Sequence, residues 1–187
     1  MHKRQNLRNS LRKTMRQKRM ALSQSQHACW SSAIVKHLQE NLLPQSIGFC
    51  MPIFNEADIL PLIFNYQKQG IATAMAKVVE KNAPLIFIPW KKNAPLAKDI
   101  CGILAPIENQ TMIPQMLLVP LLAFDAQGFR LGYGGGYFDR TLAQNCFYSV
   151  GVGFEMNRVQ SVWPQEHDQA LHAVVTEKGF FEFPRST

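Results

Sequence analysis

Four of the chain's eleven glycines stand within five positions, and the residues beside them carry charges of both signs. Glycine accepts positive φ angles and lets a ligand come close to the backbone N–H groups. Arg130 precedes this cluster, and Asp139 follows it. A cation, an acid and accessible N–H groups in so short a stretch are what a nucleotide–magnesium site needs. The cluster consists of Gly132, Gly134, Gly135 and Gly136.

The glycine cluster lies between a predicted strand and a predicted helix. Residues 117–124 form an unbroken apolar run, which is typical of a strand buried on both faces. Residues 125–128 have the composition of a turn, and a helix is expected over 139–144. A strand, a glycine loop and a helix N-terminus bind phosphate together, because free N–H groups and the helix dipole converge there.

A glycine cluster has three other interpretations. It is not a Walker A loop, because no Gly-Lys-Ser/Thr follows it. It is not a dinucleotide fingerprint either, because Tyr137 stands where a third glycine is required. A plain surface turn is the remaining alternative. The charged neighbours favour the phosphate interpretation.

The bulk composition describes a soluble globular protein, and 187 residues predict one domain over 1–187. Four cysteines lack the spacing of zinc ligands, so we expect free thiols in a reducing compartment. No apolar run reaches the roughly 18 residues that a membrane span requires. A secretory segment is not recognisable, so the expected location is the cytoplasm.

The excess positive charge is confined to the N-terminus. Residues 1–20 contain eight basic and no acidic residues, whereas the remainder carries twelve basic and thirteen acidic residues. Residues 6–22 predict an amphipathic helix, within a basic segment 1–22, whose packing stripe is Leu7, Leu11, Met15 and Leu22. The segment could bind nucleotide phosphates or nucleic acid, form a solvated face, or serve as a transit peptide. The apolar stripe argues against the transit peptide.

In the rest of the chain, predicted strands alternate with short helices, which predicts an α/β domain with a mainly parallel central sheet flanked by helices. A helix is expected after the cap residue Ser23, and another over 60–69 before Gly70. Polar or irregular loops are expected at 91–95, 99–106 and 163–169. Further strands are expected at 46–51, 71–79, 85–88, 148–154 and 173–176.

Residues 118–140, LVPLLAFDAQGFRLGYGGGYFDR, resemble the motif of the 5-formyltetrahydrofolate cyclo-ligase family. That family carries Val-Pro-Gly-Leu-Ala-Phe-Asp followed by Arg-Leu-Gly-x-Gly-x-Gly-Tyr-Tyr-Asp-Arg. Weaker similarities follow in the right order along the chain, at residues 8–12, 56–58, 102–106, 167–168 and 174–177.

The resemblance implies an ATP-dependent closure of 5-formyltetrahydrofolate to 5,10-methenyltetrahydrofolate, with release of ADP and phosphate. The γ-phosphoryl group would first activate the formyl oxygen, and a neighbouring amine of the folate would then close the ring. Such a transfer asks mainly for positioning and charge neutralisation. The expected partners are folate and ATP with Mg²⁺, with neither nucleic acid nor membrane, and a monomer is favoured.

The resemblance also implies a role for each matching residue. Arg130 and Tyr137 would be catalytic, Asp139 and Asp168 would bind Mg²⁺, and Met51 and Glu56 would hold folate together with Gly134, Gly135 and Gly136. The ATP-binding residues would be Arg8, Arg12, Arg130, Leu131, Gly132, Gly134, Gly135, Gly136, Tyr137 and Phe138. Tyr133 occupies a variable motif position and receives no role. Trp90 could stack on the pterin ring or be an ordinary buried aromatic residue.

Four residues depart from the family pattern: Ile59, Ala105, Leu121 and His172. They flank the phosphate loop rather than form it, so they bear on substrate details before the reaction itself. Two other functions remain open at this point. One is a nucleic-acid-binding module that uses the basic helix, and the other is a different ATP-dependent small-molecule ligase or kinase.

Overall fold

The computed structural model describes residues 2–184, and seven strands of this part form the central sheet. The pairings from β10 through β2 are parallel, whereas β11 and β3 join the two edges in antiparallel fashion. This confirms the predicted α/β fold with a mainly parallel sheet. The order is β11 (Gly179–Glu182), β10 (Ala173–Thr176), β9 (Tyr148–Val152), β6 (Met116–Pro120), β1 (Ser46–Phe49), β2 (Ala72–Lys77) and β3 (Ile86–Pro89).

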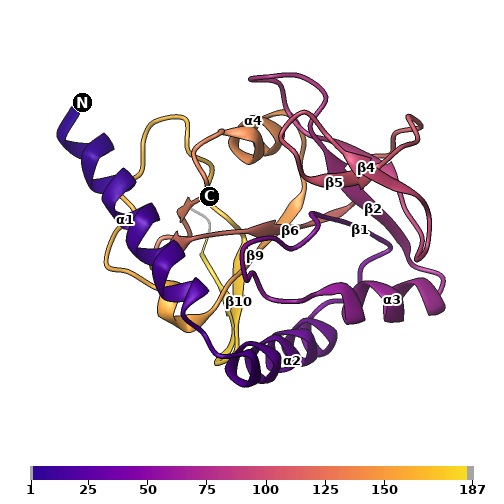
Figure 1. The fold of residues 1–187 in the computed structure, drawn as a ribbon, viewed down its shortest axis with the longest axis horizontal. Coiled ribbons are helices and arrows are strands. Elements are labelled where there is room, and N and C mark those ends of the chain that lie inside the picture. Colours follow the sequence, from indigo (N-terminus) through magenta and orange to yellow (C-terminus); the bar gives the residue numbers. More distant parts are fainter. Residues whose placement is uncertain (1, 185–187) are drawn as a thin grey trace.

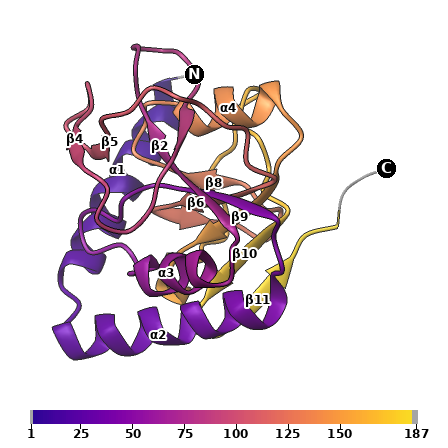
Figure 2. The ribbon, with the colours of Figure 1, turned by 90° about the vertical axis from the view of Figure 1, so that its right-hand side faces the viewer.

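Helices cover both faces of the sheet. Helices α2 (Gln24–Asn41) and α3 (Leu60–Lys68) lie on one face, and α4 (Tyr137–Gln144) lies on the other (Figure 1). The turned view shows the same layers (Figure 2). The cap predicted at Ser23 is confirmed, because its side chain and that of Gln26 form a capping box. Among residues 2–184, none of the helices has the length and hydropathy of a membrane span.

The central strand β6 is apolar throughout because both of its faces are covered. Leu118 packs into the core under α2 and α3, whereas Leu117 and Val119 pack into the core under α4. All three side chains are buried. The unbroken apolar pattern therefore reflects burial on two sides, as expected of a parallel sheet.

The apolar run 117–124 is not one strand, which corrects the prediction. Strand β6 ends at Pro120, and β7 (Ala123–Phe124) pairs with β8 (Arg130–Leu131) in a separate two-stranded ribbon. The chain leaves the central sheet at 121–122, where the N–H of Leu122 donates to the carbonyl of Leu131. This ribbon places Arg130 directly before the glycine cluster.

The N-terminal helix α1 (His2–Met20) packs largely through the predicted stripe. Met15 is buried against the β7–β8 ribbon, Leu11 packs beside it, and Leu22 packs against the core under α2 and α3, whereas Leu7 is 37% exposed. Arg8 and Arg19 are also buried. The spacing of these inward residues is helical, so the side of α1 that meets the domain is cationic. The helix also begins earlier than the predicted residue 6.

Two further strand pairs were not expected. Strands β4 (Leu96–Lys98) and β5 (Leu104–Pro106) form a hairpin where a loop over 99–106 was predicted. The edge strand β11 was also missed. All are only three or four residues long, which is too short for an apolar pattern to identify them as strands.

The strand order reverses between β1 and β6. Strand β2 follows on the far side of β1, and β9 lies on the far side of β6. In open α/β sheets, ligands bind outside the carboxyl ends of the strands at such a switch point. Glu56 follows β1, and the ribbon that holds Arg130 follows β6, so both predicted regions meet at this edge.

Candidate active site

The glycine cluster, residues 132–136, forms a loop in which two positions have the positive φ that favours glycine. Gly134 has φ +100°, and Gly136, the N-cap of α4, has φ +67°. Among residues 2–184, no protein acceptor takes a hydrogen bond from the backbone N–H groups of Gly134, Gly135 or Gly136. The loop therefore presents free donors beside the N-terminus of α4, which is the geometry of an anion site.

Arg130 and Asp139 form an ion pair across this loop. Nη2 of Arg130 lies 2.8 Å from Oδ1 of Asp139, and its Nη1 donates to the carbonyl of Gln169 at 2.6 Å. The backbone N–H of Gln169 donates to the same carboxylate oxygen at 3.1 Å. Burial lowers the pKa of Arg130 from its ordinary value, and Asp139 opposes that shift. The pair joins β8, α4 and the loop 163–169.

Arg8 and Asp168 form a second, deeper pair. Nη1 of Arg8 donates to Oδ2 of Asp168 at 2.6 Å, and its Nη2 donates to Oδ1 at 3.3 Å. Both side chains are almost completely buried. The Nε of Arg8 is buried without a hydrogen-bond partner. This pair joins the first turns of α1 to the loop 163–169.

Arg12 lies between these pairs and the glycine loop. Its Nε donates to the carbonyl of Gly132 at 2.9 Å, and a side chain at Gly134 would contact its guanidinium group. Burial lowers the pKa of Arg12, and the charge of Arg8 adds to the effect. Arg12 contacts the loop and Arg130 directly precedes it, so cations accompany the free N–H donors and the site fits an anion such as phosphate.

The carboxylates of Asp139 and Asp168 differ in how readily they could bind Mg²⁺. Oδ2 of Asp139 accepts no hydrogen bond within residues 2–184, whereas both oxygens of Asp168 accept from Arg8. No group of three acidic, histidine or cysteine ligands gathers among the described residues. Mg²⁺ in nucleotide sites usually takes one or two carboxylates together with phosphates and water. Asp139 fits that role; Asp168 would first have to part from Arg8.

Glu56 connects to the glycine loop through Tyr133. The Tyr133 hydroxyl donates to Oε1 of Glu56 at 2.5 Å, and the N–H of Ile53 donates to Oε2 at 3.0 Å. Arg19 contacts both residues, with a hydrogen bond to the hydroxyl and an ion pair at 3.8 Å to the carboxylate. Burial raises the pKa of Glu56, and these contacts oppose that shift.

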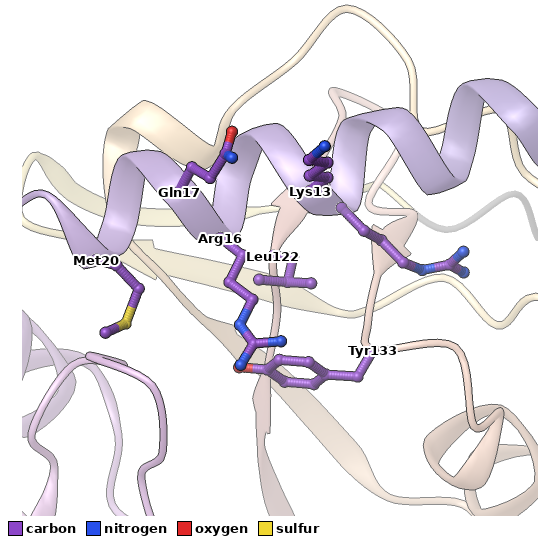
Figure 3. Close-up of a pocket in the computed structure, with 7 residues that line it drawn as sticks. Lys13, Arg16, Gln17, Met20, Leu122 and Tyr133 are labelled. Atoms are coloured by element: carbon purple, nitrogen blue, oxygen red, sulfur yellow. The ribbon is translucent and has the colours of Figure 1, made fainter.

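A cavity of about 380 Å³ lies between α1 and the glycine loop. Figure 3 shows the ring of Tyr133 facing Arg16 across it, with Leu122 behind. Cationic and apolar side chains share its wall, which suits a ligand that is aromatic and anionic at once. The lining residues are Arg12, Lys13, Arg16, Gln17, Met20, Leu122 and Tyr133.

The other residues that the sequence assigned to the site lie near the glycine loop or at the end of β1. Leu131 is buried behind the glycine loop, and Phe138 packs into the core under α4. The ring of Tyr137 lies under Gly135 and 5.0 Å from the guanidinium of Arg140. Met51 is half-buried at the carboxyl end of β1, beside the core.

Trp90 is an ordinary buried aromatic residue. It packs against Phe49 at a centroid distance of 5.9 Å, and its ring N–H donates to the carbonyl of Ala94 at 3.3 Å. The ring is 6% exposed. The alternative of stacking on a pterin is therefore not supported.

Packing explains why position 121 is leucine where the family pattern has glycine. Its side chain fills the space above Gly151 and Gly153, so an added Cβ at either glycine would lie 2.8 Å or less from it. Ile59 and Ala105 are buried, and His172 contacts Ser149 and the ring of Tyr148. All four departures occupy packing positions rather than the phosphate loop.

Arg19 and Tyr133 were missed by sequence reasoning. Tyr133 stands at a variable motif position, and Arg19 looked like one more charge in a basic helix. The helical spacing of Arg8, Arg12 and Arg19 on one face was the available signal. It could not be interpreted without knowing which face of α1 packs inward.

The profile of the 5-formyltetrahydrofolate cyclo-ligase family matches residues 3–177. The chain belongs to this family. Family membership makes it an enzyme of the ligase class.

Named relatives agree with this assignment. With the 5-formyltetrahydrofolate cyclo-ligase of Mycoplasma pneumoniae, the chain is 31% identical over 73% of its length and 77% of that protein. With the enzyme of the same name from Haemophilus influenzae, it is 38% identical over 91 residues, which cover 44% of this chain and about half, 48%, of that protein.

The solved structure of Aquifex aeolicus 5,10-methenyltetrahydrofolate synthetase has the same fold. It superposes with a TM-score of 0.84 at 26% identity and covers 97% of this chain and 95% of that one. The fold of the cyclo-ligase is therefore shared along nearly the whole chain.

Proposed function

We propose that this cyclo-ligase converts 5-formyltetrahydrofolate and ATP to 5,10-methenyltetrahydrofolate, ADP and phosphate. The observation that carries the proposal is the joining of two unlike half-sites. An arginine-lined glycine loop suits ATP, and Tyr133 connects it to a buried carboxylate, Glu56, that suits a folate. The names of the relatives support this reaction, and the arginine-lined loop and the buried carboxylate support binding of ATP and of the folate.

The reaction needs an acceptor held in line with the γ-phosphoryl group. The formyl oxygen takes that group, and the P–O bond to ADP breaks. A neighbouring amine of the folate then attacks the activated carbon, and the C–O bond breaks to release phosphate. Arg130 and Arg12 neutralise charge that develops on the transferred group, and the free N–H donors of the glycine loop orient it. Tyr137 borders the same loop.

On the folate side, Glu56 accepts paired N–H donors of the pterin, and Met51, which packs against the core after β1, contacts the same ring. On the nucleotide side, Asp139 would hold Mg²⁺, which neutralises phosphate charge when bound. Asp168 and Arg8 support the same wall of the site, and we keep metal binding by Asp168 as part of the proposal. All these groups come from one chain, so a monomer stays the expectation.

An absorbance assay tests the proposed function. Purified protein with ATP, Mg²⁺ and 5-formyltetrahydrofolate should gain the absorbance of the methenyl product. Asp139→Ala should lose at least about 100-fold in kcat/KM, because the metal ligand and the partner of Arg130 are both removed. Glu40→Ala, which removes an exposed partner of Lys36, is the matched control and should retain activity.

No product at any enzyme concentration, with the protein folded, would refute the cyclo-ligase function. Consumption of ATP with other small acceptors, but not with this folate, would instead indicate a different ATP-dependent ligase or kinase on the same fold.

A further inference from the structure

The hydroxyl of Tyr133 is the junction between the two halves of the site. Tyr133 stands inside the glycine loop, between Gly132 and Gly134, and its Oη lies 2.5 Å from Oε1 of Glu56, a residue 77 positions earlier. Arg19, from α1, donates to the same hydroxyl. Three segments distant in the sequence therefore meet at one oxygen atom.

The chemistry of Arg19 fixes which way the Tyr133 proton points. A guanidinium group can only donate hydrogen bonds, so the Tyr133 oxygen must accept from Arg19. The single proton of the hydroxyl is then available for Glu56 alone. Arg19 cannot readily turn away, because its Nε donates to the carbonyl of Phe54 at 2.9 Å and its Nη1 to that of Leu121 at 3.2 Å. The side chain is 1% exposed.

The same contacts fix the orientation of the Glu56 carboxylate. Oε1 accepts from Tyr133, and Oε2 accepts from the N–H of Ile53 at 3.0 Å. A carboxylate has about four acceptor positions, so one remains on each oxygen. One remaining acceptor position on each oxygen suits a planar ligand that carries two adjacent N–H donors.

We propose that Tyr133 is a positioning residue that holds Glu56 ready to accept the paired donors of the folate ring, with Arg19 setting the direction of its proton. This rests on the proposed function, because the ring is that of its substrate. The hydroxyl also stabilises the ionised carboxylate, since its hydrogen bond opposes the rise in the pKa of Glu56 that burial causes. Loss of the Tyr133 hydroxyl should therefore affect both the orientation and the ionisation of the Glu56 carboxylate.

The first test is a titration of the free protein. Tyr133→Phe keeps the ring and removes only the hydroxyl, and NMR of the side-chain carboxyl carbons reports the pKa of Glu56. We expect a higher pKa in Tyr133→Phe than in the wild type. An unchanged or lower pKa would overturn the proposal, whether or not the protein turns over folate.

The second test is kinetic and uses a matched control. Tyr148→Phe removes another tyrosine–glutamate hydrogen bond, 3.0 Å from Glu182 and remote from the site. Tyr133→Phe should lose about tenfold or more in kcat/KM for the folate at neutral pH. The acid limb of its pH profile should also move to higher pH, because Glu56 must be ionised to accept. Tyr148→Phe should match the wild type in both respects.

The outcomes separate this inference from the function on which it rests. A wild-type protein that makes no methenyl product refutes the function, and the NMR titration still decides whether Tyr133 stabilises ionised Glu56. An active wild type whose Tyr133→Phe profile coincides with that of Tyr148→Phe upholds the function and overturns the positioning role.

Discussion

At the scale of single residues, the site is built from charges that have been taken out of water. Arg8, Arg19 and Arg130 are all buried, and each contacts a carboxylate within 4 Å. An ion pair of this kind contributes little net stability, but removing one partner leaves an uncompensated buried charge. These buried ion pairs therefore fix the geometry of the site more than they stabilise the fold.

Asp168→Ala should destabilise the protein because Arg8 would lose both carboxylate contacts. We expect the free energy of unfolding to fall by about 3–5 kcal/mol, measured by urea denaturation. Glu40→Ala, at a pair whose side chains are 71% and 53% exposed, should change it by less than about 1 kcal/mol. Unaltered stability in Asp168→Ala, combined with lost Mg²⁺-dependent activity, would show that Asp168 serves as a metal ligand instead.

At the scale of elements, the site depends on where β6 ends and on the path of the chain from there to α4. After Pro120 the chain enters the β7–β8 ribbon, which delivers Arg130 and then the glycine loop to the N-terminus of α4. Helix α1 closes the loop from outside through Arg12. The glycine loop is thus held on three sides by regular structure, so its shape is set before any ligand arrives.

Gly134→Ala should be costly for conformational reasons. Its φ of +100° is strained for any residue with a Cβ, so we expect a loss of about 1–2 kcal/mol in unfolding free energy. Gly132 has no positive φ and no atom within 4 Å of an added Cβ. Gly132→Ala should therefore stay within about 0.5 kcal/mol of the wild type by urea denaturation. Equal losses in the two variants would contradict this account.

Much of the fold could be predicted from local patterns, because strands such as β6 and caps such as Ser23 depend on neighbours in sequence. The same holds for the glycine loop, whose neighbours Arg130 and Asp139 lie close along the chain. The break at 121–122 could not be predicted, because residues 117–124 are apolar throughout and their pattern does not mark where β6 ends. The role of Tyr133 depends on Arg19, 114 positions away, and only the tertiary structure brings them together.

At the scale of the whole molecule, helix α1 has two sides: one contacts the domain, and the other faces solvent. Arg8, Arg12 and Arg19 face the domain and are tied to named acceptors. Lys3, Arg4 and Lys18 are exposed. The inward cations are thus occupied by the site, which argues against a helix that serves chiefly to bind nucleic acid.

Replacing the outward cations should leave catalysis intact. In the triple variant Lys3→Ser, Arg4→Ser, Lys18→Ser, we expect kcat/KM within about twofold of the wild type in the absorbance assay, because surface substitutions remote from a site change little. A gel-shift measurement with duplex DNA should show only weak, salt-sensitive retention in the wild type and none in the variant. Tight DNA binding that survives moderate salt would revive the nucleic-acid hypothesis.

The three inward arginines contact residues 102, 120 and 160 positions further along the chain. A ribosome makes the N-terminus first, so α1 leaves the exit tunnel long before its docking surface exists. Until the loop 163–169 has been synthesised, Arg8 has no carboxylate to pair with, and its charge must stay in contact with water. Chains released early, before Asp168, should therefore be inert rather than partly active. We expect the first turnover only after synthesis has passed Asp168.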